Sequence, residues 1–215
     1  MSVQIDRVVT SGTFSLDGGE WDVENNVWIV GDDKSVIIID PAHDIDAISR
    51  AVAGRTVEKI LLTHAHDDHI AQAKTAADRF QAPVFLHPND QELWQMQYPE
   101  WDFDQKLSHG LTIPVAGIEL RVLHTPGHTP GSVCFYSSDL SWENSDGVVF
   151  SGDTLFQGGP GAAGRSFSSF DTIIDSIQNQ LLTLPESTAV LTGHGEHTGI
   201  GLEAPDVSEW VRRGH

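Results

Sequence analysis

Five side chains that bind metals or exchange protons are crowded into six consecutive positions of this chain. His64, His66 and His69 alternate with the carboxylates Asp67 and Asp68. Neutral imidazoles combined with a carboxylate suit Zn, Fe(II) or Mn better than Ca or Mg. One histidine here would be an ordinary surface-loop residue, but a surface loop does not explain five potential ligands in a row. We therefore predict a transition-metal site.

The segments on either side decide how these ligands are presented. Residues 57–63 (VEKILLT) are short, apolar and partly β-branched, which predicts a strand. Residues 70–80 (IAQAKTAADRF) are rich in alanine and free of glycine and proline, which predicts a helix. The ligand-rich turn thus lies at a strand-to-helix junction.

Two pairs of ligands follow from this junction. Side chains two positions apart on an extended backbone point the same way, so His64 lies with His66. Asp68 and His69 open the helix, where a carboxylate also suits the free N–H groups. The turn can therefore hold two divalent ions, one at each pair.

Composition restricts the class of protein. The chain has 215 residues, of which 39% are hydrophobic and 20% charged, so we expect a globular protein with one domain over residues 1–215. A net charge of −19 argues against a nucleic-acid partner. No apolar run is long enough to cross a membrane, and no secretory signal is visible. With Cys134 as the single cysteine, these features predict a cytoplasmic protein.

The N-terminal part reads as strands joined by loops. Residues 3–10, 26–30 and 35–39 are predicted strands, and residues 11–22 are expected to form a loop because they contain three glycines. Asp40 ends the third strand. It is either a turn residue before proline or a hydrogen-bond partner of a ligand histidine.

Three further motifs follow predicted strands later in the chain. His128 stands in TPGHTPGS, a tight loop in which the backbone approaches closely. Asp153 stands in SGDTLF and His194 in TGHG. Taken alone, each of them has an ordinary reading as a turn residue. Taken in order with HAHDDH, the four motifs resemble the signature of the metallo-β-lactamase superfamily.

This resemblance implies a fold and a ligand set. The fold is α/β, a four-layer αβ/βα sandwich of two mixed β-sheets flanked by helices. The resemblance implies two divalent metal ions, zinc first, with iron or manganese as alternatives. Asp153 bridges the two ions, the first held by His64, His66 and His128 and the second by Asp68, His69 and His194.

Within the superfamily the chain is most similar to small glyoxalase II-like hydrolases, that is, hydroxyacylglutathione hydrolase-like enzymes. Arg165 lies near the position where that family has a basic residue that grips a substrate carboxylate; the alternative is an ordinary surface arginine. Glyoxalase II normally has a C-terminal helical domain that helps to grip glutathione. Too few residues follow His194 for that domain. The thiol carrier therefore stays open.

The activity that the resemblance implies is metal-dependent hydrolysis of a small-molecule thioester of the S-lactoylglutathione type. A hydroxide that bridges the metals is the nucleophile, and Asp68 and Asp153 are the catalytic carboxylates. A thiolate leaves without a proton, which favours a thioester over a lactam. Two alternatives remain: a mononuclear-iron persulfide dioxygenase, and a metal-binding protein that has lost catalysis. The oligomeric state is not predicted.

Overall fold

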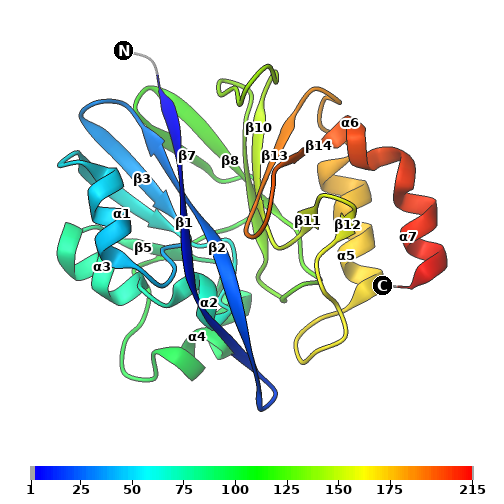
Figure 1. Ribbon diagram of the computed structural model, residues 1–215, viewed down its shortest axis with the longest axis horizontal. Coiled ribbons are helices and arrows are strands. Elements are labelled where there is room, and N and C mark those ends of the chain that lie inside the picture. The colour runs from blue at the N-terminus through cyan, green and yellow to red at the C-terminus, as the bar shows by residue number, and fades with distance from the viewer. Residues whose placement is uncertain (1–2, 215) are drawn as a thin grey trace.

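The computed structural model describes residues 3–214, which form two six-stranded β-sheets with helices outside them (Figure 1). The predicted αβ/βα sandwich is confirmed. The first sheet has the strand order β1-β2-β3-β4-β5-β6 and the second the order β14-β13-β10-β9-β8-β7. Helices α1 (Ile45–Val52) and α3 (Ala73–Phe80) lie outside the first sheet, and α5 (Phe170–Ser176) and α7 (Val207–Arg213) outside the second (Figure 1).

The first sheet is mixed. Its first three strands pair antiparallel, and its last four, starting again from β3, pair parallel. Parallel strands place their carboxyl ends at one edge of the sheet, where the next turns gather. The strands are β1 Gln4–Leu16, β2 Gly19–Gly31, β3 Ser35–Ile39, β4 Thr56–Leu61, β5 Val84–Leu86 and β6 Gln105–Lys106.

The second sheet is antiparallel except where β10 pairs parallel with β13. Its strands are β7 Thr112–Val115, β8 Ile118–His124, β9 Val133–Ser137, β10 Val148–Gly152, β13 Ala189–Thr192 and β14 Thr198–Gly199. A separate two-stranded ribbon joins β11 (Leu155–Phe156) to β12 (Gly159–Pro160).

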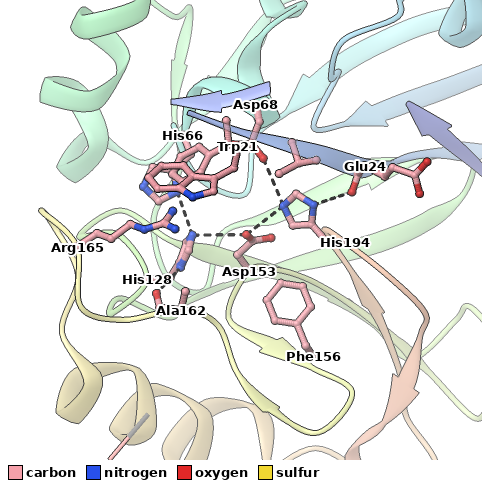
Figure 2. A pocket seen from close by; sticks show the side chains of 12 residues that line it. Trp21, Glu24, His66, Asp68, His128, Asp153, Phe156, Ala162, Arg165 and His194 are labelled. Atoms are coloured by element: carbon pink, nitrogen blue, oxygen red, sulfur yellow. Dashed lines mark hydrogen bonds and ion pairs between the residues drawn. The ribbon is translucent and has the colours of Figure 1, made fainter. Parts of the chain in front are cut away.

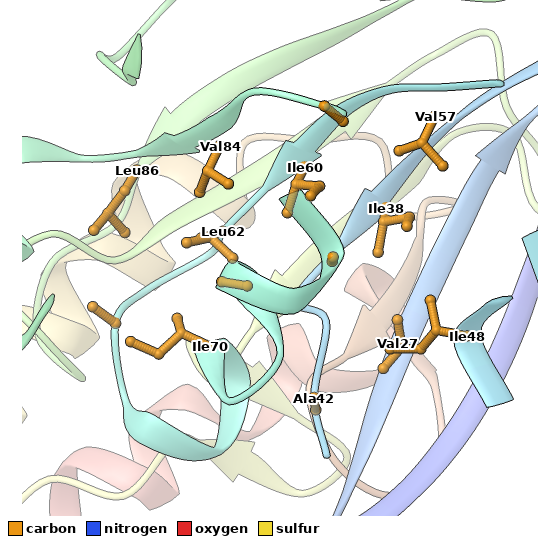
Figure 3. Packing of buried hydrophobic residues seen from close by; sticks show 14 of the residues in the cluster. Val27, Ile38, Ala42, Ile48, Val57, Ile60, Leu62, Ile70, Val84 and Leu86 are labelled. Carbon is orange, nitrogen blue, oxygen red and sulfur yellow. The ribbon is translucent and has the colours of Figure 1, made fainter. Parts of the chain in front are cut away.

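Strand β3 shows how the layers are held together. Its successive side chains point to opposite faces of the sheet. Ile37 and Ile39 enter the core between the two sheets, while Val36 and Ile38 enter the core beneath the helices. Figure 3 shows this second core, in which Ile38 lies in the same apolar cluster as Ile48 of α1. A strand buried on both faces explains why residues 36–39 are continuously apolar.

Two element predictions were wrong in detail. Residues 11–22 are not a loop but the end of the long β1–β2 hairpin, in which Leu16 pairs with Gly19. The two turn residues, Asp17 and Gly18, both have positive φ, as a type I′ hairpin turn requires. The predicted helix over residues 70–80 is two helices, α2 (Asp67–Ile70) and α3, because helical structure breaks at residues 71–72.

The remaining helical segments are short. They are α4 (Gln91–Gln97), α6 (Ile200–Glu203), the π-helical turn Ile177–Leu181 that extends α5, and the 3-10 turns Pro88–Asp90 and Ala204–Asp206. Over residues 3–214, no helix combines the length and apolar character needed to span a membrane.

Candidate metal centre

The structure brings His64, His66 and His128 together although 62 positions separate the last two. His66 Nδ1 lies 3.1 Å from His64 Nε2 and 2.9 Å from His128 Nε2. All three side chains are buried. The first two leave the end of β4, and His128 lies in the turn between β8 and β9, so the two sheets meet at this cluster.

A second cluster lies beside the first. His69 Nε2 is 3.1 Å from His194 Nε2, and Asp68 Oδ2 is 3.3 Å from His194 Nε2. Asp68 and His69 come from α2, whereas His194 follows β13. This is the second ligand set that the motifs implied.

Asp153 lies between the two clusters, directly after β10 (Figure 2). Its Oδ1 is 3.3 Å from His69 Nε2, and its Oδ2 is 3.3 Å from His194 Nε2 and 3.5 Å from His128 Nε2. One carboxylate thus contacts ligands of both clusters, which is the placement required of a bridging residue.

The donor atoms fit cations better than they fit one another. In the first cluster the ring nitrogens His64 Nε2, His66 Nδ1 and His128 Nε2 converge. A single N–H can form a hydrogen bond between two of these nitrogens, and the third then has no hydrogen-bond partner. Asp153 Oδ1 is buried and accepts no hydrogen bond. Buried polar atoms are normally paired, so atoms left in this way mark a site for a bound group. Imidazole and carboxylate donors are those that divalent transition metals take.

The protonation states of the first cluster and of Asp153 agree with this fit. Burial, helped by the nearby imidazole of His128, lowers the pKa of His66 to about 3, and burial with neighbouring imidazoles also lowers the pKa of His64. Burial alone would raise the pKa of Asp153, but His194 and His69 hold it well below its ordinary value. Neutral imidazoles and an ionised carboxylate are the forms that bind a cation. In the second cluster burial alone would lower the pKa of His69 and His194, but Asp153 and Asp68 raise it, so a cation bound there would displace protons.

Asp40 stabilises the HAHDDH turn through hydrogen bonds to Thr63 and His69. Its two oxygens accept hydrogen bonds from Thr63 N at 2.7 Å and Thr63 Oγ1 at 2.6 Å. Its Oδ2 also lies 3.0 Å from His69 Nδ1, so that Nε2 of His69 faces the cluster. Of its two readings from the sequence, the hydrogen-bond partner of a ligand is therefore the one that the structure shows. Asp40 has a φ of +52°, a strained conformation held by these contacts.

Asp90 was missed by the sequence analysis. It is fully buried and accepts hydrogen bonds from Ala65 N at 3.0 Å, Thr129 Oγ1 at 2.8 Å and Gly131 N. It thereby ties the HAHDDH turn to the turn that carries His128. A β-carbon at Gly131 would lie 2.6 Å from Asp90 Cγ, so the turn needs a glycine there.

Asn26 holds the turn of the last ligand in a similar way. Its Nδ2 donates to Thr192 O at 3.0 Å and to Gly195 O at 2.9 Å, on either side of His194. Asn26 N donates to Gly193 O at 2.7 Å, which joins β2 of the first sheet to the second. No short motif around Asn26 marks this role, because its partners lie far along the chain.

A cavity of about 390 Å³ opens above the two clusters. Its floor includes His66, Asp68, His128, Asp153 and His194, and its walls include Phe14, Trp21, Val23, Phe156 and Arg165. Figure 2 shows Arg165 beside Trp21 at the side of the pocket. The guanidinium carbon lies 3.9 Å from the centre of the indole ring and 5.0 Å from the centre of the Phe14 ring. Arg165 therefore borders the same cavity as the candidate ligands.

Two histidines next to the motifs, which the sequence analysis left out of the site, lie outside both clusters. His124 stacks on His87, with ring centres 4.1 Å apart. His197 Nε2 lies 3.6 Å from Glu143 Oε2.

Residues 21–194 match the family model of the metallo-β-lactamase superfamily. This range begins at Trp21 of the pocket wall and ends at His194, the last candidate ligand. The chain belongs to the metallo-β-lactamase superfamily. It is 33% identical to the probable metallo-hydrolase YqgX of Bacillus subtilis, over 84% of this chain and 90% of that protein. The chain is a superfamily member with a metal-binding cluster of histidines and aspartates.

Two further members are informative. The chain is 29% identical to the hydroxyacylglutathione hydrolase GloC of Haemophilus influenzae, over 84% of this chain and 89% of that protein. It also resembles the crystal structure of TTHA1623 in a di-iron-bound form, with 31% identity, a TM-score of 0.67 and coverage of 85% and 93% of the two chains. These comparisons support the expectation that the chain is a metal-dependent hydrolase.

Proposed function

We propose that this chain is a binuclear metallohydrolase that cleaves a thioester of a small thiol. The observation that carries the proposal is the position of Asp153, whose two oxygens face ligands of both clusters. The similarity to a hydroxyacylglutathione hydrolase supports the thioester, and the similarity to a di-iron-bound structure supports two ions. Zinc is our first choice, with iron or manganese as alternatives.

Divalent cations held in such a pair polarise a carbonyl oxygen and lower the pKa of water to about 7. The residues of the chain would orient the substrate and accept protons. Asp68 and Asp153 are the carboxylates that line the floor of the cavity, and we infer that they accept the proton that the attacking water loses. The water oxygen bonds to the carbonyl carbon, and the carbon–sulfur bond breaks with its electron pair on sulfur. A thiolate, with a pKa of roughly 8.5, leaves without needing a proton.

The walls of the cavity fit the rest of such a substrate. Phe14, Trp21 and Phe156 offer apolar surface to carbon chains. Across residues 3–214, no side-chain acceptor is hydrogen-bonded to the guanidinium of Arg165, which rests on the face of Trp21. Its N–H edges are thus available to a carboxylate, which guanidinium binds through two parallel hydrogen bonds. We therefore propose that Arg165 grips an anionic group of the thiol carrier.

The same proposal gives the chain a small-molecule partner in the cytoplasm, with no role for nucleic acid or a membrane surface. A net charge of −19 opposes phosphate binding, and a reducing compartment suits a lone thiol, that of Cys134.

The test is a pair of assays on metal-depleted protein reloaded with zinc, iron or manganese. We expect two ions per chain and release of thiol from S-D-lactoylglutathione. His128→Ala should reduce hydrolysis to background, whereas His197→Ala, outside both clusters, should not change it. One iron per chain with oxygen uptake on a thiol persulfide would establish the dioxygenase alternative instead. Bound metal without either activity would establish a binding protein.

A further inference from the structure

Asn25 of β2 is fully buried beside the second cluster, and the proposed function gives it no role. Its Nδ2 donates to Asp68 Oδ2 at 2.9 Å. On its other side, Asn25 Oδ1 lies 2.8 Å from His43 Nε2. The three side chains therefore form a continuous hydrogen-bonded chain that ends on a candidate metal ligand.

The direction of each hydrogen bond follows from chemistry. An ionised carboxylate only accepts, so the amide nitrogen of Asn25 must face Asp68 and its oxygen must face His43. His43 must then carry its proton on Nε2 in order to donate. Because a carboxylate oxygen has two lone pairs, Asp68 Oδ2 can accept the Asn25 hydrogen bond and still face the cluster.

The backbone around His43 is built to place its ring here. His43 has a φ of +41°, a conformation that few residues other than glycine adopt and that its surroundings must hold in place. A β-carbon at Gly12 of β1 would overlap the ring of His43, so a glycine at that position makes room for it. An ordinary turn histidine would not need both features.

We propose that Asn25 and His43 are positioning residues that fix the orientation of Asp68 for the second cation. The inference rests on the second ion of the proposed function. Asn25 acts directly on the carboxylate, and His43 acts through Asn25 by holding the amide in one orientation. Partners that orient a ligand in this way typically change metal affinity 10- to 100-fold when they are removed.

The experiment is a titration of metal-depleted protein with Zn²⁺ against a competing chelator, which gives an affinity for each of the two ions. In Asn25→Ala we expect the second ion to bind about 10- to 100-fold more weakly and the first to bind unchanged. The first ion is an internal control, since a misfolded variant would lose both. Asn179→Ala, the same change at an exposed position, should leave both affinities unaltered.

His43 is tested separately. His43→Leu should weaken binding of the second ion. His43→Gln should retain most of the affinity, because its amide N–H can replace Nε2–H. In the double variant, His43→Leu should cause no further loss of affinity beyond that of Asn25→Ala. Equal affinities in Asn25→Ala and the parent chain, or equal loss of both ions, would overturn the proposal for Asn25. An additive effect of His43→Leu, or no effect at all, would overturn the indirect role of His43.

Failure of the proposed function can be distinguished in the same data. A parent chain that binds two Zn²⁺ ions but releases no thiol contradicts the thioester activity alone. If the parent chain binds only one Zn²⁺ ion, there is no second metal site, and this inference is overturned together with it.

Discussion

In the proposed binuclear centre Asp153 serves two ions with one side chain, so it is the most demanding single position there. Its neighbours hold it ionised although it is almost fully buried. A buried carboxylate without compensating charge is costly, and bound cations supply that charge. Its contacts with both clusters make its removal different from the loss of any single histidine.

We predict that Asp153→Ala lowers the occupancy of both ions, and that loss of any single histidine lowers the occupancy of its own cluster first. The measurement is metal content after dialysis against a weak chelator. Asp139→Ala is a suitable control because Asp139 is exposed. Full metal content and full activity in Asp153→Ala would show that this residue bridges nothing.

His87 gives a prediction that does not depend on metal. Burial, together with the stacked imidazole of His124, lowers its pKa to about 4. The unfolded chain takes up a proton on this residue near pH 6.5, well before the folded chain does. The stability that His87 contributes is therefore present above pH 6.5 and is lost as the pH falls towards 4.

Between pH 7 and pH 5, we expect the free energy of unfolding of the parent chain to fall by about 1 kcal/mol more than that of His87→Gln, after allowing for solvent screening. Denaturant unfolding of metal-depleted protein at the two pH values measures this. His87 Nδ1 also accepts a hydrogen bond from Asn89 N, so the variant loses some stability at every pH. Only the difference between the two pH values tests this prediction.

At this scale the sequence was informative where chemistry is concentrated in a short motif. The candidate ligands His64, His66, Asp68, His69, His128, Asp153 and His194 all stand in such motifs, and the structure brings them together. Asp67 of the same motif instead accepts a hydrogen bond from Ser15 N. Asn25 and Asp90 do not, because Asn25 contacts residues 18 and 43 positions away and Asp90 contacts residues at least 25 positions away. A lone buried polar residue gives no local signal of the group that it will meet.

At the scale of elements, the β1–β2 hairpin forms one wall of the cavity. It supplies Phe14 and Trp21, and Asp17 at its tip accepts a hydrogen bond from Ser166 N at 3.0 Å. The hairpin and the loop that carries Arg165 therefore contact each other at the side of the cavity. The glycines of residues 11–22 indicated a loop, but Gly18 serves the turn and Gly12 makes room for a side chain. Glycine content alone does not separate these uses from a flexible loop.

We predict that Trp21→Ala raises the KM about three- to tenfold for a thioester whose thiol carries a carboxylate, with little change in kcat, because Arg165 loses the ring that holds it. Trp21→Phe should retain most of the effect of the ring. Steady-state kinetics on matched thioesters with and without the carboxylate provide the measurement. Trp21 is 40% exposed, so the substitution leaves the core intact.

Val9→Ala, at another exposed position of the same hairpin, is the matched control. An equal rise in KM for the charged and the uncharged substrate would mean that Trp21 acts only as apolar surface and does not position Arg165.

For the molecule as a whole, both sheets turn the same edge towards the site. β4 ends before His64, β10 before Asp153 and β13 before His194. The fold could be predicted because each ligand motif follows an apolar strand, and stacked sheets gather such strand ends along one edge. The pairing of the strands could not, since it depends on contacts between distant residues such as Val148 of β10 and Ala189 of β13.

The spacing of His69 and His194 along the chain has a consequence for biosynthesis. These two imidazoles face each other across 125 positions of sequence. Translation adds about 5–20 residues per second, so several seconds pass between the incorporation of His69 and that of His194 into the chain. A ribosome-bound fragment therefore displays an incomplete chelate throughout that interval. Tight binding of a cation at the second cluster therefore requires that His194 has already been synthesised.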